Sequence, residues 1–258
     1  MYLSIFLRTH DGKNFHGGNR FVDVDKKEIM IVSLKSLVSS INNFNKAEET
    51  LFTIIDDHSS EETLERMKKE TAICKCDVNY IHLDNTGNGE SLKKTYELAM
   101  ANGANLIYFV EDDHLHKDTA VQFMVNAWEQ FSPKLCENQV AIAPYDDPID
   151  YHPDRITPTR IVASSDCHWR QNFHTTCTMM ITKWILLHFW DKFMAVTNYG
   201  INGISEDNTI NLMYDKEVVL FTPIPFQAVH LQTVPPVIGD WKSLYNINIP
   251  CNISQVGL

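Results

Sequence analysis

The feature that most constrains this sequence is a regular alternation of strand-like and helix-like segments across its first half. Compact apolar runs, typical of buried strands, occupy residues 2–7, 51–55, 78–83 and 106–110. Segments with helical spacing of apolar residues or with helix-capping residues lie between them, over 26–44, 59–71 and 89–103. This order predicts an α/β fold with a mostly parallel sheet flanked by helices and a ligand crevice at the carboxyl ends of the strands.

The pattern after residue 117 is less regular. We expect helices over 118–131, 183–194 and 205–214, and strands over 140–144, 175–182 and 218–226. Residues 145–159 are rich in Pro and Asp and are expected to form a loop, and the tail from residue 232 is expected to be irregular. Because there is neither a repeat nor a low-complexity linker, we predict a single domain over 1–258 with two halves, 1–116 and 117–258.

The composition excludes some classes of partner. The chain of 258 residues has 44% hydrophobic content and a formal net charge of -11, so we expect a globular protein that binds neither nucleic acid nor an anionic membrane. No apolar stretch is long enough for a membrane span, and the first residues do not resemble a signal peptide. We therefore expect a soluble, cytoplasmic protein whose six scattered cysteines are free thiols.

Polar residues stand at the ends of three predicted strands, where parallel strands bring them to one edge. They are Arg8 and Thr9, Asp56 and Asp57, and Glu111, Asp112 and Asp113. Isolated acidic residues after strands often only begin turns, which would account for Asp56. Three adjacent carboxylates repel one another unless a cation compensates. We therefore predict a divalent ion, Mn²⁺ or Mg²⁺, at the end of the predicted strand 106–110.

Three motifs together resemble a known family. The stretch "LIYFVEDDHLH" resembles the strand and DxD element of GT-A glycosyltransferases, "FTIIDDHSSEET" resembles the DDxS strand end of their family-2-like members, and "GISEDNTIN" is similar to their catalytic ED element. The motifs occur in the family's order and span about residues 2–212. The resemblance implies a GT-A (Rossmann-like) fold whose first half, 1–116, binds a nucleotide-sugar and whose second half, 117–258, binds the acceptor.

The resemblance also implies roles on the donor side. Asp57 would bind the nucleobase, with Thr9 and Arg8 lining a uridine-type pocket; Asp113 would ligate the ion, and Asp112 would contact ribose or the metal shell. Glu111 stands where the family usually has aspartate, which leaves its role open.

Six basic or imidazole side chains lie in or near these motifs. Lys93 or Lys94 would lie near the diphosphate, or both would simply be solvated; His230 would be a metal ligand or a core residue. His114 and His116 are expected to be loop residues rather than ligands. His58 occupies a position where glycine is commoner in the family.

The chemistry requires a base for the acceptor hydroxyl. By the resemblance, Asp207 is the general base of an inverting transfer, with Glu206 beside it at the start of the predicted helix 205–214; the alternative is that both only cap that helix. Trp169, Phe173 and Trp241 are candidates for an aromatic acceptor platform, or are plain core residues.

Two other functions remain open. A sugar-phosphate nucleotidyltransferase would need a glycine-rich phosphate loop directly after the first strand, and the glycines here come late. A non-catalytic carbohydrate-binding protein on a transferase fold would not need the Asp207 carboxylate.

Overall fold

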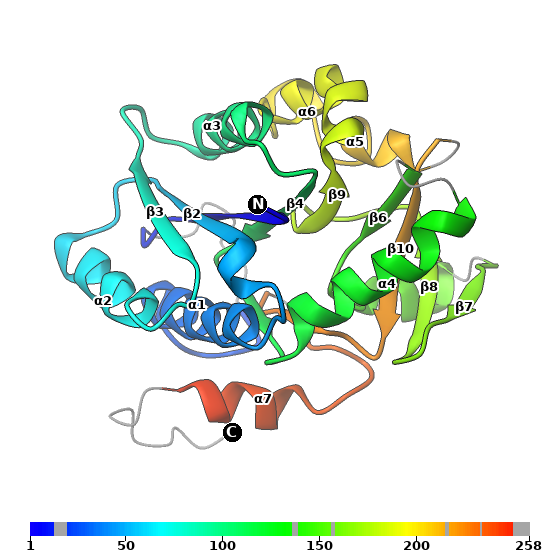
Figure 1. Ribbon diagram of the computed structural model, residues 1–258, viewed down its shortest axis with the longest axis horizontal. Coiled ribbons are helices and arrows are strands. Elements are labelled where there is room, and N and C mark those ends of the chain that lie inside the picture. Colours follow the sequence, from blue (N-terminus) through cyan, green and yellow to red (C-terminus); the bar gives the residue numbers. More distant parts are fainter. Residues whose placement is uncertain (13–19, 136–138, 156–157, 215–216, 233, 250–258) are drawn as a thin grey trace.

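The computed structural model describes residues 1–12, 20–135, 139–155, 158–214, 217–232 and 234–249 (Figure 1). The helices are α1 (Lys26–Asn42), α2 (Glu61–Thr71), α3 (Asn88–Ala101), α4 (Ala120–Leu135), α5 (Lys183–His188), α6 (Trp190–Val196) and α7 (Trp241–Asn248). The strands are β1 (Leu3–Thr9), β2 (Thr50–Asp56), β3 (Asp77–His82), β4 (Leu106–Glu111), β5 (His114–His116), β6 (Val140–Ile142), β7 (Ile161–Ala163), β8 (His168–Asn172), β9 (Met179–Thr182), β10 (Val219–Ile224) and β11 (Ala228–His230).

One nine-stranded sheet runs through both halves of the sequence in the order β3-β2-β1-β4-β9-β6-β10-β8-β7. The four strands of the first half are parallel. β9 is antiparallel to both β4 and β6, so β6 and its parallel neighbour β10 run in the same direction as β1. The carboxyl ends of β1, β2, β4, β6 and β10 therefore face the same edge, and the predicted mostly parallel α/β fold is confirmed.

Both faces of the sheet are buried under helices. Side chains alternate along each strand, so Leu3, Ile5 and Leu7 of β1 join the core beneath α1 and α4, whereas Phe6 points to the core beneath α3, α5 and α6. Figure 1 shows these helices on opposite sides of the sheet. The near-continuous apolar runs of the sequence are explained by this two-sided burial.

A second, two-stranded sheet positions the functional site. β5 and β11 pair antiparallel, with His114 opposite His230. Their apolar side chains, Leu115 and Val229, pack against α1 and α7 in a third core cluster. The ribbon lies beside the carboxyl end of β4, because only two residues separate β4 from β5.

Several predictions for the second half were wrong. Residues 205–214 are not an α-helix but turns followed by a short 3-10 helix, η6 (Ile210–Met213). The hydroxyl of Thr209 donates to the Ser205 carbonyl and the Asn208 side chain accepts from the Ser205 N–H, so local side-chain bonds compete with a helix here. The predicted helix 183–194 is divided at Phe189 into α5 and α6.

The tail is also more ordered than expected. Its helix α7 begins after Asp240, whose carboxylate accepts the Ser243 N–H as an N-cap. Only the second half of the predicted strand 175–182 is a strand, and β7 and β8 were not predicted. No helix in the described ranges combines the length and apolar character that crossing a bilayer requires.

Candidate functional site

The carboxyl ends of β1, β2 and β4 bring the predicted polar residues together. In the sheet register, Thr9 lies opposite Asp56 and Arg8 lies opposite Glu111. The Asp56 carboxylate is fully buried and accepts hydrogen bonds from the Thr9 hydroxyl (3.0 Å) and the Ser59 N–H (3.1 Å). Asp56 is therefore a structural residue that ties the two strand ends together.

Asp57 closes the neighbouring turn. Its Oδ2 accepts the Gly87 N–H at 2.8 Å, which joins the end of β2 to the start of α3. His58 has the left-handed φ of 58°, consistent with a position that favours glycine. Lys93 is exposed on α3 and Lys94 is half-buried beside it.

Each of the three adjacent carboxylates at the end of β4 has a cationic side chain of this chain as its own partner. The pairs are Arg8–Glu111 (2.8 Å between Nη2 and Oε1), Arg20–Asp113 (3.2 Å between Nη1 and Oδ2) and Lys26–Asp112. Repulsion among these carboxylates therefore does not by itself require a bound ion. The prediction of a metal ion from the repulsion of these carboxylates is therefore weakened. The evidence for a metal site depends instead on the neighbouring histidines.

Asp112 has both carboxylate oxygens engaged. Oδ1 contacts Lys26 at the start of α1, and Oδ2 accepts the His10 N–H at 2.9 Å. These bonds tie Asp112 to His10, just after β1, and to the start of α1.

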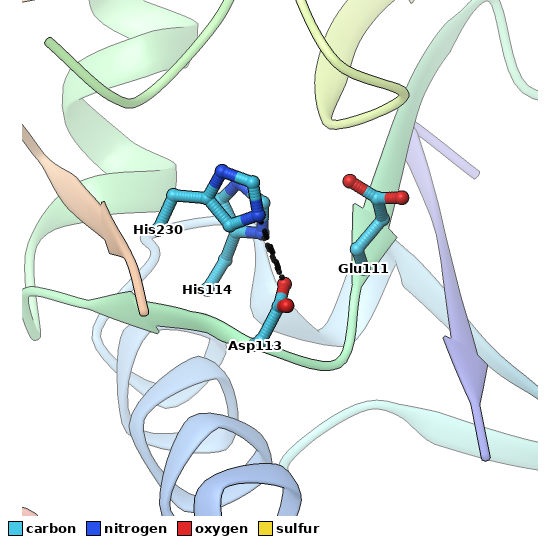
Figure 2. A group of neighbouring side chains, drawn as sticks. All are labelled: Glu111, Asp113, His114 and His230. Atoms are coloured by element: carbon cyan, nitrogen blue, oxygen red, sulfur yellow. Dashed lines mark ion pairs between the residues drawn. The ribbon is translucent and has the colours of Figure 1, made fainter. Parts of the chain in front are cut away.

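Four side chains converge beside this turn, as Figure 2 shows: Glu111, Asp113, His114 and His230. One ligand atom from each lies within 4.8 Å of the other three. The two imidazole rings are stacked, with centroids 4.3 Å apart and planes at 15°, because His114 and His230 are opposite one another in the β5–β11 ribbon.

The ligand atoms of this cluster are incompletely satisfied, which fits a bound cation. Asp113 Oδ1, His114 Nε2 and His230 Nε2 are buried and have no hydrogen-bond partner. His114 Nδ1 and His230 Nε2 lie 3.3 Å and 3.4 Å from Asp113 Oδ1. Two carboxylates and two imidazoles are a donor set that Mn²⁺ and later first-row ions accept readily.

The electrostatics of the cluster favour an ionised carboxylate. Burial alone would raise the pKa of Asp113, but the charge of His230, the hydrogen bonds of both histidines and the charge of Lys26 together outweigh it and hold that pKa well below its ordinary value. Burial and His230 together lower the pKa of His114, so this imidazole is kept neutral. An ionised carboxylate and a neutral imidazole are the forms that bind metals. Burial lowers the pKa of His230, but the charge and hydrogen bond of Asp113 contribute to raising it overall, so a bound metal would have to displace a proton from this imidazole.

His114 was expected to be a loop residue and instead belongs to this cluster, whereas His116 lies outside it. His116 is buried and its Nε2 lies 2.6 Å from the Tyr108 hydroxyl; burial lowers its pKa to about 3. Residues two apart on a strand point to the same face, so strand alternation alone does not assign the two histidines different roles. The position of His114 opposite His230 was missed because β5 was read as a loop.

Glu206 and Asp207 lie on the turn before η6. The Asn211 amide donates to Asp207 Oδ1 at 2.9 Å, and the Asp207 side chain is otherwise exposed. Burial, followed by the charges of Glu111 and Asp207, raises the pKa of Glu206. The influence of Glu111 on Glu206 places this turn on the same side of the molecule as the strand ends.

The three aromatic candidates lie in different environments. Trp169 is fully buried, packs edge-on against Phe131 and donates its indole N–H to Ser164 at 3.0 Å, so it is a core residue with no ring face open to a sugar. Trp241 is half-buried against Phe21, with ring centroids 4.8 Å apart. Phe173 is 42% exposed at the end of β8.

A polar network beside Phe173 was not predicted. His174 Nε2 lies 2.9 Å from Asp150 Oδ1, and Arg170 Nη1 lies 3.0 Å from Asp150 Oδ2. Burial lowers the pKa of His174, but the hydrogen bond and charge of Asp150 outweigh it and raise that pKa overall, with a further contribution from Asp207. The charge of Asp207 thus reaches this network.

Comparison with solved structures identifies the fold. S. aureus TarS (residues 1–349) matches with a TM-score of 0.52 and 13% identity, over 86% of this chain and 60% of that one. The mannosyltransferase PcManGT from Pyrobaculum calidifontis, solved with GDP-Man and Mn²⁺, matches with a TM-score of 0.53 and 11% identity, over 86% of this chain and 54% of that one. This chain has the GT-A fold.

GalNAc-T7, solved with UDP, GalNAc and Mn²⁺, also shares this GT-A fold, with a TM-score of 0.55 and 10% identity over 86% of this chain and 42% of that one. The chain thus spans less than two thirds of the length of each of these proteins. Neither a family model nor a curated protein sequence matches it.

Proposed function

We propose that this protein is a glycosyltransferase that moves a sugar from a nucleotide-diphosphate sugar, with a UDP-sugar favoured, to a hydroxyl group of a glycan or another acceptor. The observation that carries the proposal is the convergence of Glu111, Asp113, His114 and His230, with unsatisfied ligand atoms, at the carboxyl end of β4 in a GT-A fold. Proteins of similar structure hold UDP-GlcNAc, GDP-Man or UDP, and two of them hold Mn²⁺.

On the donor side, the proposal assigns the nucleobase to Asp57, with Thr9 and Arg8 lining its pocket. Arg8 is fixed by Asn88 and Glu111, at 2.6 Å and 2.8 Å, so its guanidinium is held between β1, β4 and the start of α3. Lys93 or Lys94 on α3 is proposed for the diphosphate. Asp112 would contact ribose only after exchanging its bond to Lys26 or His10.

The cation site would consist of Asp113, Glu111 and His230, with His114 as a further ligand. Mn²⁺ or Mg²⁺ bound there would stabilise the negative charge that develops on the diphosphate as the glycosidic bond breaks. Arg20 holds Asp113 through Oδ2, which leaves Oδ1 directed at the two histidines.

The transfer itself would use Asp207 as general base. Its carboxylate takes the proton of the acceptor hydroxyl while that oxygen attacks the anomeric carbon from the face opposite the diphosphate. The bond from carbon to the diphosphate oxygen breaks, its electron pair leaves with the diphosphate, and the anomeric configuration inverts. Glu206 would hold the acceptor hydroxyl, and Phe173 and Trp241 remain the proposed contacts to its sugar face.

Donor turnover tests the proposal. Purified protein is incubated with UDP-, GDP- and CMP-sugars, with Mn²⁺ or with EDTA, and release of the nucleotide is measured. Release from one class of donor only in Mn²⁺ supports a transferase. Turnover of a nucleoside triphosphate with a sugar phosphate would indicate a nucleotidyltransferase, and metal-dependent binding without any turnover would indicate a non-catalytic carbohydrate-binding protein.

A further inference from the structure

The segment Thr175–Thr178, between β8 and β9, contacts the histidine cluster. The Tyr145 ring packs edge-on against His114, with centroids 5.5 Å apart, and its hydroxyl lies 2.7 Å from Thr175 Oγ1. The Thr178 hydroxyl accepts the Glu111 N–H at 3.0 Å. Tyr145 and Thr178 are both buried, so these contacts fix the segment against the cluster.

The same segment also holds Asp207, through Asn211. The Thr175 N–H donates to Asn211 Oδ1 at 3.0 Å, and Asn211 Nδ2 donates to Asp207 Oδ1 at 2.9 Å. A backbone N–H can only donate and an ionised carboxylate can only accept. The Asn211 side chain must therefore direct its Oδ1 at the Thr175 N–H and its Nδ2 at Asp207. Asn211 is 8% exposed, and its own N–H donates to the Glu206 carbonyl at 2.9 Å.

Asp207 depends on this support because it lies on an irregular turn and not in a helix. A general base must remain within hydrogen-bond reach of the hydroxyl it deprotonates, and displacement by about 1 Å can lower the rate about 100-fold. We propose that Asn211 is a positioning residue that fixes the Asp207 carboxylate relative to the histidine cluster through the segment Thr175–Thr178. The proposal depends on the proposed function and deepens it.

The decisive variant is Asn211→Asp, which is nearly isosteric. It keeps an acceptor for the Thr175 N–H but replaces the donor that faces Asp207 with a second carboxylate. We expect kcat for Mn²⁺-dependent hydrolysis of the best donor, from a panel that includes UDP-GlcNAc and GDP-mannose, to fall about 10- to 100-fold. KM for that donor should stay within about twofold, because the donor contacts are untouched.

A second readout separates positioning from general structural damage. Two adjacent carboxylates share a proton, so the acidic limb of the kcat–pH profile should move to higher pH by about one unit in Asn211→Asp. Asn211→Ala removes the donor without adding a charge, so kcat should fall while the limb stays in place. Asn79→Asp, on the exposed edge strand β3, adds the same charge elsewhere and should change neither quantity.

Thermal unfolding and stabilisation by UDP with Mn²⁺ establish that each variant is folded and binds nucleotide. If Asn211→Asp does not fold, Asn211→Ala and Tyr145→Phe carry the test, and both should lower kcat. Unchanged kcat in the folded Asn211 variants would overturn the proposal.

A double variant distinguishes this proposal from the assignment of the base. Asp207→Asn combined with Asn211→Asp should be no slower than Asp207→Asn alone, because Asn211 acts through Asp207. A further loss in the double variant would contradict the positioning role. If Asp207→Asn alone keeps full activity, the assignment of Asp207 as base fails instead.

Discussion

The two acidic turns of the candidate site compensate their charge differently. In the turn of Glu111, Asp112 and Asp113, each carboxylate is paired with an arginine or lysine of the same chain. In the turn of Glu206 and Asp207, the Asn211 amide holds one carboxylate, and burial raises the pKa of the other. The first turn therefore holds its carboxylates with positive charges, whereas the second holds the Asp207 carboxylate with a neutral amide.

The largest expected effect is at the second turn. Asp207→Asn keeps the shape of the side chain but removes the base, so we expect kcat to fall about 1,000-fold while the affinity for UDP in Mn²⁺ changes less than about twofold. Steady-state kinetics and calorimetric titration measure the two quantities. Asp191→Asn, on the exposed side of α6, is the matched control and should leave both unchanged; an equal loss in UDP affinity would show that Asp207 serves the donor.

At the first turn, Asp113→Asn should affect binding rather than the proton transfer. It removes a charged ligand atom, and we expect Mn²⁺ affinity to fall more than about 100-fold, beyond what loss of a supporting residue around a metal usually causes. Calorimetric titration with Mn²⁺ alone measures the effect without donor. Asp84→Asn, on the exposed loop after β3, provides the control, and retained Mn²⁺ affinity in Asp113→Asn would place the ion elsewhere.

Charge compensation at the first turn can be tested through stability. Lys26→Met leaves the largely buried Asp112 carboxylate without its cation, and we expect the free energy of unfolding to fall by about 2 kcal/mol. Lys69→Met, at an exposed position of α2, should cost less than about 0.5 kcal/mol. Urea titrations compare the two variants, and equal stability would mean that the Lys26–Asp112 pair contributes nothing.

The choice of ion depends on the paired histidines. His114→Gln replaces one of two imidazoles, and since imidazole favours later first-row ions over Mg²⁺, Mn²⁺ affinity should fall about tenfold with little change for Mg²⁺. Titrations with each ion give the ratio. His188→Gln, a half-exposed imidazole on α5, is the control, and an unchanged ratio of Mn²⁺ to Mg²⁺ affinity in His114→Gln would remove His114 from the ligand set.

The smallest expected effect concerns the network beside the second turn. Because Asp150 raises the pKa of His174 in the folded protein, the stabilising charge is present at low pH and is lost as the pH rises through that raised value. We expect His174→Gln to be less stable than the wild type by about 1 kcal/mol near pH 6 and by much less near pH 8. Urea titrations at both pH values, with the exposed His168→Gln as control, measure this difference; a difference independent of pH would show that His174 is not charged.

The first half of the fold could be predicted because its strands are buried on both faces and its helices carry clear periodicity. The strand-end residues Arg8, Thr9 and Glu111 then followed from the parallel order. The turn at Asp207 could not be predicted, since Ser205, Asn208 and Thr209 form local bonds that a helical pattern does not reveal. The sequence left Trp169 open between the acceptor platform and the core, because β8 is short and its register depends on β10, far away in the sequence.

The cations of the first turn could not be predicted either. Arg20 and Lys26 reach Asp113 and Asp112 across about 90 residues of sequence, which no local pattern encodes. The role of His114 depends similarly on its pairing with His230 in the β5–β11 ribbon.

A crystal structure with UDP and Mn²⁺, in which anomalous scattering locates the ion, tests the central claim most directly. We predict an Mn²⁺ peak within about 2.5 Å of Asp113 and His230, with the diphosphate bound to the same ion and Asp207 facing the open side of the donor site. An ion or a nucleotide located away from the carboxyl ends of β1, β2 and β4 would contradict the account.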